Sequence, residues 1–477
     1  MAGPTAETAE TVEEEPRPRL RRAMGLFDLI LFYVATSFSL RWIATAAATG
    51  PGALAVWGIA CLAFFVPLAL AVLELSSRHP DQGGIYVWTK RAFGGFSGFM
   101  AGWLYWSSNL PYLPSLLYFG AANALFVGGD SWQRLADDRG YFLLVSLLGL
   151  GVAVAVNVVG LDVGKWLHNL GAVGQWLPAA ALVGLGVVSF TRFGSATEFT
   201  AASLLPDFSF KDVIFWSTMA FAFGGVESAS NMSEEIRDAR RNVPRALLAG
   251  GLLIAAVYVL ATAALLVALP QSEVTGLQGI LQAITRVGAR LGLEGLGPPV
   301  AVLVTLGVLG TTGAWFAATA RLPFVAGLDR YLPPAFGRLH PRWGTPHVAL
   351  LVQAAVAAVI CVLGQAGTTV KGAYEVLVSM GIISYFIPYL FLFAALIKLQ
   401  REPAGPEVVR VPGGRPVALL VGGLGFATTT ASIVFACIPA ADEPHKALAA
   451  AKTIGLSLLL AAVGAAVYAA GVRRARS

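Results

Sequence analysis

The sequence predicts an all-α polytopic membrane protein with twelve transmembrane helices. Of its 477 residues, 56% are hydrophobic and only 13% are charged, and the mean hydropathy is +0.70. A soluble domain carries roughly 25% charged residues, so this chain has too few to cover a water-facing surface. The apolar residues also form long continuous stretches of roughly 20 residues, which is the length needed to cross a bilayer. These observations exclude an ordinary cytosolic enzyme.

The apolar stretches are rich in Leu, Ala, Gly and Val and do not alternate between apolar and polar residues. This pattern favours helices over a β-barrel. The twelve predicted spans lie near residues 29–48, 54–74, 97–127, 141–160, 169–190, 212–233, 246–269, 297–320, 347–365, 373–397, 416–439 and 449–471. An even number of spans places both termini on the same side of the membrane.

The distribution of lysine and arginine indicates which side that is. If the N-terminus is cytosolic, the cytosolic segments contain 23 of the 33 Lys and Arg residues, and the opposite segments contain nine. Cytosolic loops carry an excess of these residues, so we expect a multi-pass protein of the cytoplasmic membrane with both termini in the cytosol. The net charge of +6 is then a topology signal. We expect the lipid bilayer as a partner and no nucleic acid.

Two of the predicted spans are interrupted near their middle. The sixth contains the sequence FAFGGVESAS over residues 221–230, with the pair Gly224 and Gly225 followed by Glu227. The first contains the polar sequence TSFSLRW over residues 36–42. The first and sixth spans are corresponding members of two five-helix halves, and paired interruptions of this kind indicate a transporter substrate site. The unwound backbone and the half-helix ends there can bind a polar substrate.

Arg41 and Glu227 are the charged residues deepest in the predicted spans, whereas Glu74 lies close enough to a span end to reach water. A charge at the bilayer centre costs about 2.5 to 3.5 kcal/mol, so such groups usually face a cavity or a partner. Two interpretations are open. Arg41 and Glu227 form a structural pair between the broken helices, or Arg41 biases the site toward a carboxylate and Glu227 either carries a proton or accepts hydrogen bonds from the broken helix.

Trp315 follows Gly313 in the middle of the eighth span. It either packs in the protein core or lines a cavity, where an aromatic ring can stack on a cationic or planar group of a substrate. Elsewhere, the three cysteines lie in apolar stretches without a CxxC motif, and the five histidines form no HExxH pair. We therefore expect no metal site, no cofactor and no enzymatic activity.

Several segments resemble one family, the amino acid-polyamine-organocation permeases. Residues 221–230 and 234–245 match its sixth helix and the loop after it. Residues 320–333 and 345–347 match the end of its eighth helix and the loop that follows. Residues 74–77 and 82–88 match the end of its second helix and the loop after that helix. With the twelve predicted spans, the resemblance covers nearly the whole chain.

The resemblance implies a leucine-transporter-like core of two inverted five-helix repeats, with two extra helices outside it. The corresponding segments are a disordered cytosolic tail at 1–24, a transporter core at 25–400, the last two helices at 401–471 and a cytosolic tail at 472–477. It also implies roles for individual residues. Ser37 holds a carboxylate, Asn109 faces the substrate, Phe221 acts as an aromatic gate and Trp315 stacks on the substrate.

The predicted substrate-binding residues are Ser37, Ser39, Arg41, Asn109, Phe221, Gly224, Gly225 and Trp315, and Glu227 is predicted to serve coupling or gating. The chain departs from the family at two places. The family's Gly-Ser-Gly motif in the first helix is replaced here by Thr-Ser-Phe at residues 36–38. In the fifth helix, Gln175 lies where some relatives carry a lysine that stands in for a sodium ion. The coupling ion is therefore not assigned by analogy.

The resulting hypothesis is a secondary active transporter of an amino acid or related amine, working by alternating access and coupled to protons in symport. The alternatives are an amino acid or amine exchanger without net ion coupling, a polyamine permease, a non-transporting membrane sensor and an ion channel. The sequence leaves open the identity of the substrate, the coupling ion and stoichiometry, the direction of transport, the oligomeric state and the role of Arg41.

Overall fold

The computed structural model describes residues 21–206, 210–274, 278–364, 370–438 and 446–476. Throughout this part of the chain the regular secondary structure is helical, which confirms the all-α class. Ten helical stretches are long and apolar enough to cross a membrane, which confirms a multi-pass protein. They are Leu26–Ala47, Ala53–Arg78, Gly95–Gly128, Arg139–Val159, Leu161–Phe193, Ala239–Ala268, Glu294–Leu328, Gly381–Leu399, Gly414–Ala436 and Ser457–Arg474.

Some of these stretches consist of more than one helix. The α-helices are α1 (Leu26–Ser37), α2 (Leu40–Ala47), α3 (Ala53–Ala60), α4 (Val66–Arg78), α5 (Ile85–Phe93), α6 (Gly95–Ala124), α7 (Asp130–Gln133), α8 (Arg139–Val159), α9 (Leu161–Phe193), α10 (Phe210–Ala222), α11 (Ala239–Ala268), α12 (Gly279–Arg290), α13 (Gly297–Leu328), α14 (His347–Gly364), α15 (Val370–Leu399), α16 (Gly414–Ala436) and α17 (Lys446–Arg476). A π-helical turn, η1 (Cys61–Phe65), joins α3 to α4. The short 3-10 helices are η2 (Leu125–Gly128), η3 (Ser228–Glu235), η4 (Gln271–Glu273), η5 (Glu294–Leu296) and η6 (Pro334–Gly337).

Two predicted spans are not among the ten. The sixth corresponds to α10, which has 13 residues because it stops at the interruption after Ala222. The ninth corresponds to α14, an 18-residue helix next to residues outside the described ranges. The count of twelve spans and the inverted repeat therefore stay predictions.

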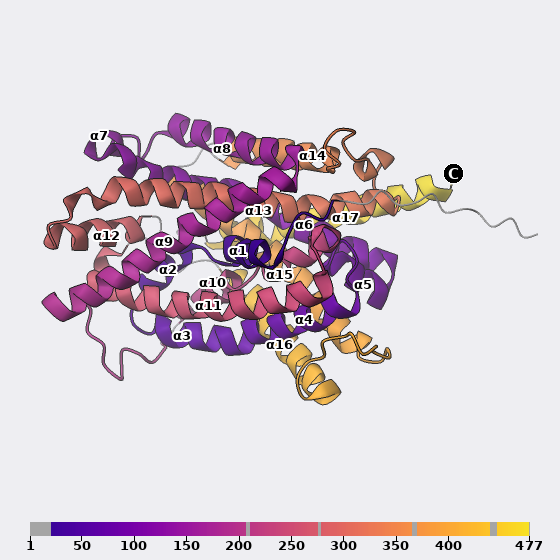
Figure 1. Ribbon diagram of the computed structural model, residues 1–477, viewed down its shortest axis with the longest axis horizontal. Coiled ribbons are helices and arrows are strands. Elements are labelled where there is room, and N and C mark those ends of the chain that lie inside the picture. The colour runs from indigo at the N-terminus through magenta and orange to yellow at the C-terminus, as the bar shows by residue number, and fades with distance from the viewer. Residues whose placement is uncertain (1–20, 207–209, 275–277, 365–369, 439–445, 477) are drawn as a thin grey trace, which may run out of the picture.

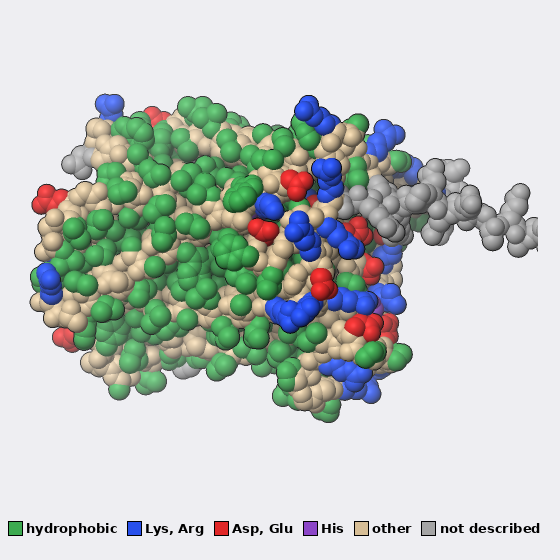
Figure 2. All heavy atoms as spheres, in the orientation of Figure 1, with side chains coloured by type: hydrophobic (Ala, Val, Ile, Leu, Met, Phe, Trp, Pro, Cys, Tyr) green, Lys and Arg blue, Asp and Glu red, His purple; other side chains and the backbone are tan. Residues whose placement is uncertain are grey.

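The long helices lie side by side along the longest axis of the molecule (Figure 1). Helices α7 and α12 lie at one end, and α5 lies at the other end with the C-terminus. Figure 2 shows apolar side chains over most of the visible face, while Lys and Arg gather at the end that holds the C-terminus. We call this the basic end. It comprises the last turn of α4 with the loop into α5, α5 itself, the loops after α13 and α15, and the last turns of α17. A broad apolar face of this kind suits contact with lipid.

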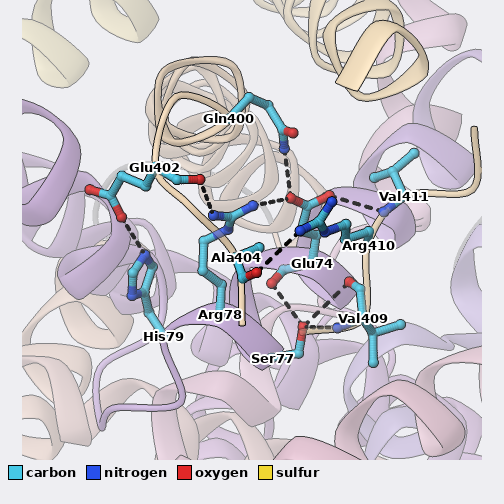
Figure 3. A network of polar contacts seen from close by, with 10 residues as sticks. All are labelled: Glu74, Ser77, Arg78, His79, Gln400, Glu402, Ala404, Val409, Arg410 and Val411. Carbon is cyan, nitrogen blue, oxygen red and sulfur yellow. Dashed lines mark hydrogen bonds and ion pairs between the residues drawn. The ribbon is translucent and has the colours of Figure 1, made fainter. Parts of the chain in front are cut away.

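The carboxylate of Glu74 at the basic end is buried, with an exposed fraction of 1%. It accepts hydrogen bonds from Arg78 Nη2 at 2.6 Å, from Gln400 Nε2 at 2.7 Å and from the Val411 amide at 2.9 Å (Figure 3). The expectation that Glu74 reaches water is wrong. Three donors, one of them cationic, replace the water that this carboxylate loses on burial.

Residues 1–20 of the predicted N-terminal tail lie outside the described residues. Ala23 and Met24 are buried, and their amides donate to the Glu235 carbonyl at 3.0 and 3.1 Å. The Arg237 amide in turn donates to the Met24 carbonyl at 2.9 Å. The chain that enters α1 is therefore attached to the segment that follows α10 and η3.

Candidate substrate site

The predicted interruption of the first span is present between α1 and α2. Phe38 and Ser39 adopt extended backbone conformations and divide the span into two helices. Side chains from other helices bind the amides that this break frees from helical hydrogen bonding. The Ser39 amide donates to the Tyr258 hydroxyl at 3.1 Å, and the Leu40 amide donates to Gln175 Oε1 at 3.2 Å. The break is thus held open by α11 and α9.

The predicted interruption of the sixth span is present after α10. Gly225 has a φ of +106°, a conformation that residues with a side chain rarely adopt. A Cβ atom at this position would lie 2.7 Å from the Thr36 carbonyl oxygen. Ser228 Oγ donates to Thr36 Oγ1 at 3.1 Å just beyond the glycine. Glycine is therefore required for the two breaks to approach each other.

A small cavity lies between the two breaks. Of the eight predicted substrate-binding residues, six line it, namely Ser37, Ser39, Asn109, Phe221, Gly224 and Trp315. The other lining residues are Thr36, Phe38, Trp42, Ser108, Tyr112, Ala222, Tyr258, Gly381 and Tyr385. The cavity is thus built from α1, α2, α6, α10, α11, α13 and α15 together with the two breaks.

Three polar atoms of the lining residues are buried and have no hydrogen-bond partner within the described part of the chain. They are Ser37 Oγ, Ser39 Oγ and Trp315 Nε1. Asn109 differs, because its Nδ2 donates to the Tyr105 carbonyl at 2.7 Å. A buried polar atom without a partner is costly, and these three gather at one cavity. They are available to a polar ligand.

Aromatic rings form one wall of the cavity. Phe221 contacts Trp42, Tyr112 and Tyr385, with ring centroids 5.5, 6.0 and 5.1 Å apart. Tyr112 also contacts Trp315 at 5.6 Å. The sequence identified Phe221 and Trp315 but missed the other three. Tyr112 lies three residues after Asn109, so helical periodicity could have revealed it, whereas nothing local distinguishes Tyr385.

Glu227 is fully buried but does not line the cavity. Its Oε1 accepts hydrogen bonds from the hydroxyls of Tyr105 and Tyr385, the latter at 3.0 Å. Its Oε2 accepts from the Gly225 amide at 3.2 Å. The carboxylate therefore fixes the break after α10 and connects it to α6 and α15. A change of its protonation would alter all of these contacts.

Arg41 is also fully buried. It is not one of the residues that line the cavity, but its neighbour Trp42 is. Arg41 Nη1 donates to Ser115 Oγ at 3.2 Å, and its guanidinium carbon lies 4.2 Å from the ring centroid of Trp42 and 4.8 Å from that of Tyr112. Arg41 and Glu227 thus have separate partners, and the interpretation in which they pair with each other is wrong.

Gln175 connects three helices behind the cavity. Its Oε1 accepts from the Leu40 amide at 3.2 Å, and its Nε2 donates to Thr311 Oγ1. The side chain is buried, with an exposed fraction of 2%. A neutral amide therefore bridges α2, α9 and α13 at this position.

The segments that carried the family resemblance contact one another between the cavity and the basic end. Arg321 binds Glu235 through two hydrogen bonds, Nε to Oε1 at 2.7 Å and Nη2 to Oε2 at 2.9 Å. Gln82 Oε1 accepts from the Glu234 amide at 3.1 Å. The chain after the sixth-span break is thus fixed to α13 and to the loop before α5.

A sequence model of the family described as amino acid permease matches residues 24–460. The chain belongs to this family. The match confirms the predicted resemblance, and the family consists of transporters and not of enzymes. The chain brings together, around one cavity, two helix breaks that are 185 residues apart in the sequence, counted from Ser39 to Gly224.

Curated relatives agree with this assignment. An uncharacterized transporter of Legionella pneumophila is 28% identical over 429 residues, covering 89% of this chain and 92% of the relative. A probable agmatine/putrescine antiporter of Lactococcus lactis is 25% identical over 425 residues, covering 88% of this chain and 89% of the relative. An uncharacterized transporter of Mycobacterium tuberculosis is 28% identical over 378 residues, covering 77% and 78%. All three relatives bear the names of transporters, and the alignments cover 78% to 92% of their length.

Proposed function

We propose that this permease is a secondary active transporter that moves an amino acid or related amine across the cytoplasmic membrane by alternating access. The observation that carries the proposal is the cavity between two broken helices, with the hydroxyls of Ser37 and Ser39 and the indole N–H of Trp315 left without protein partners. Substrate hydrogen bonds would satisfy these atoms, while the ring of Trp315 would stack on a planar or cationic group.

Two groups of contacts are our candidates for the closures of the cavity. One is the aromatic wall around Phe221, and the other is the Arg321–Glu235 pair, which lies further along α13 than the cavity-lining Trp315. We assign the basic end to the cytosol, because Lys and Arg gather there (Figure 2). Alternating access would then open one closure at a time, through rocking of the spans that contain α1, α4, α10 and α11 against the other helices.

Glu227 is our candidate for proton coupling. It connects the sixth-span break to Tyr105 and Tyr385, so protonation would change the contacts that hold the break. In proteoliposomes, Glu227→Gln should abolish substrate accumulation driven by an imposed pH gradient while leaving exchange of internal for external substrate. If gradient-driven accumulation survives in this variant, the coupling role is wrong.

Exchange without net ion coupling is the second candidate, because one relative bears the name of an antiporter. Preloading the vesicles decides between the two modes. A strict exchanger takes up little substrate into empty vesicles and much more into loaded ones, whereas a symporter accumulates substrate in empty vesicles under a gradient.

The site itself is tested by Ser37→Leu, which fills the cavity with an apolar side chain. Uptake should be lost while the protein still reaches the membrane in normal amounts. Thr430→Leu is the matched control, because the Thr430 side chain is exposed on α16 and bonds only within its own helix at 2.8 Å. Normal uptake by Ser37→Leu would contradict the site.

A further inference from the structure

Arg41 is a buried cation whose hydrogen bonds are incomplete. Its exposed fraction is 0%, and among the described residues Ser115 Oγ is the one hydrogen-bond acceptor of its guanidinium. The Nε and Nη2 atoms have no partner among the residues that the structure describes. Nor does any described carboxylate lie within ion-pair distance of it.

Burying the Arg41 guanidinium in this way reduces the stability of the folded protein. A buried charge without a counterion loses its hydration and gains little in return. The rings of Trp42 and Tyr112 offset part of that loss through cation–π contacts, and the Ser115 hydroxyl supplies one neutral acceptor. The Nε and Nη2 nitrogens stay unsatisfied within the described part of the chain, and a guanidinium with free donors matches the geometry of a carboxylate.

The position of Arg41 connects these donors to the substrate path. Trp42 and Tyr112, whose rings contact the guanidinium, both line the cavity. The Phe221 ring contacts the same two residues. Arg41 therefore lies directly behind the aromatic wall, so movement of that wall would bring the guanidinium into contact with a ligand.

Among the described residues, the surroundings of Arg41 include the positive end of a helix dipole and no carboxylate within ion-pair distance. Arg41 lies in the first turn of α2, and the N-terminal end of a helix favours an anion. The nearest buried acid of the site, Glu227, is held by Tyr105, Tyr385 and the Gly225 amide. A ligand group that satisfies Arg41 is therefore anionic.

We propose that Arg41 binds a carboxylate of the transported substrate, so that the protein carries amino acids and discriminates against the amines formed from them by decarboxylation. The carboxylate contacts the guanidinium when the rings of Trp42 and Tyr112 separate, in the state that is open opposite the basic end. This inference rests on the proposed transport function and names its substrate class.

Matched ligand pairs test the proposal, because each pair differs only by one carboxylate. Binding of ornithine and putrescine, arginine and agmatine, and glutamate and 4-aminobutyrate is measured on the purified full-length protein in lipid nanodiscs. The wild type should bind the amino acid of at least one pair about 10- to 100-fold more tightly than its amine. Arg41→Gln should remove this preference, and Arg41→Lys should retain part of it.

Arg290→Gln is the matched control, since Arg290 is exposed on α12 away from the cavity, and it should keep the wild-type preference. If Arg41→Gln does not fold, Ser115→Ala and Arg41→Lys decide, because both should weaken the preference. An unchanged preference in the Arg41 variants, or equal binding of amino acid and amine by the wild type, overturns the proposal.

The outcomes also separate this proposal from the transport function. If an amine is taken up as well as its matching amino acid and Ser37→Leu abolishes that uptake, the transport function holds and the assignment of Arg41 is wrong. If no member of any pair binds to the folded wild type or is transported by it, both fail together.

Discussion

Arg41 and Arg321 are both fully buried, one beside the cavity and the other on the way to the basic end, but their surroundings differ. Arg321 makes two hydrogen bonds to the Glu235 carboxylate and donates a third to the Ala317 carbonyl at 2.8 Å. Arg41 has a single hydroxyl acceptor and two aromatic rings. The first arginine is satisfied by the protein itself, whereas the second retains donors that only another molecule or another conformation can satisfy.

A similar contrast separates one buried carboxylate at the basic end from the side chains that line the cavity. At the basic end, Glu74 has three donors although it is buried. Around the cavity, Ser37, Ser39 and Trp315 leave polar atoms without partners in the described part of the chain. Unsatisfied polar groups reduce stability and are expected where a protein binds something. Glu74 is thus satisfied by the protein itself, whereas the three cavity atoms are not satisfied by any described residue.

The largest expected effect comes from breaking the satisfied pair. Glu235→Ala leaves Arg321 as an uncompensated buried charge, which should cost about 3–5 kcal/mol of stability. Thermal unfolding in detergent should show a clearly lower midpoint than the wild type. The double variant Arg321→Met with Glu235→Leu removes both charges and should recover most of that loss. A Glu235→Ala protein as stable as the wild type would remove the contrast between the two regions.

A smaller effect is expected at the contact between the breaks. Gly225→Ala places a Cβ atom 2.7 Å from the Thr36 carbonyl oxygen at a φ of +106°, and such backbone strain costs about 1–3 kcal/mol. Uptake should fall together with the unfolding midpoint. Gly423→Ala on α16 is the control, since its added Cβ meets nothing within 4 Å. Equal midpoints for the two variants would show that the breaks do not need this close approach.

Arg41→Met should change stability by no more than about 1 kcal/mol, or increase it, because replacing an incompletely satisfied buried charge by an apolar chain is often neutral or favourable. Substrate binding should nevertheless be lost. Arg321→Met is the comparison, because it leaves Glu235 buried without its partner and should lower the midpoint strongly. Similar destabilisation by both substitutions would mean that Arg41 also holds the fold.

The smallest expected effect is the pH dependence of stability that His79 causes at the basic end. Burial lowers the pKa of His79, and the nearby Arg91 lowers it further. The His79 imidazole therefore binds a proton more readily in the unfolded chain than in the folded one. The contribution of neutral His79 to the free energy of unfolding is complete above the unfolded pKa of about 6.5 and is lost as the pH falls below it. Unfolding midpoints from about pH 7.5 to about pH 5.5 should decrease less in His79→Asn than in the wild type. Equal decreases would assign the acid sensitivity to other groups.

Local properties of the sequence were sufficient for the fold class and for much of the site. Composition and apolar stretches predicted a polytopic helical protein, because a span must be apolar over its whole length. The family resemblance predicted Phe221. Polar residues and glycines inside such stretches predicted both helix breaks, and with them Ser37, Ser39 and Gly224, which line the cavity. These features depend on consecutive residues, so a single sequence contains them.

Only the tertiary structure decided which partners these residues have. The sequence offered a pairing of Arg41 with Glu227, but α6 supplies Ser115 to the first and Tyr105 to the second. It also placed Glu74 in water, whereas Gln400 and Val411 from a distant loop bury it. Contacts of this kind depend on which helix faces lie together, and long apolar helices can pack in many ways that their sequences do not distinguish. The sequence therefore determined where the helices break, and the packing of the helices around those breaks determined which charges are satisfied and which are left for a substrate.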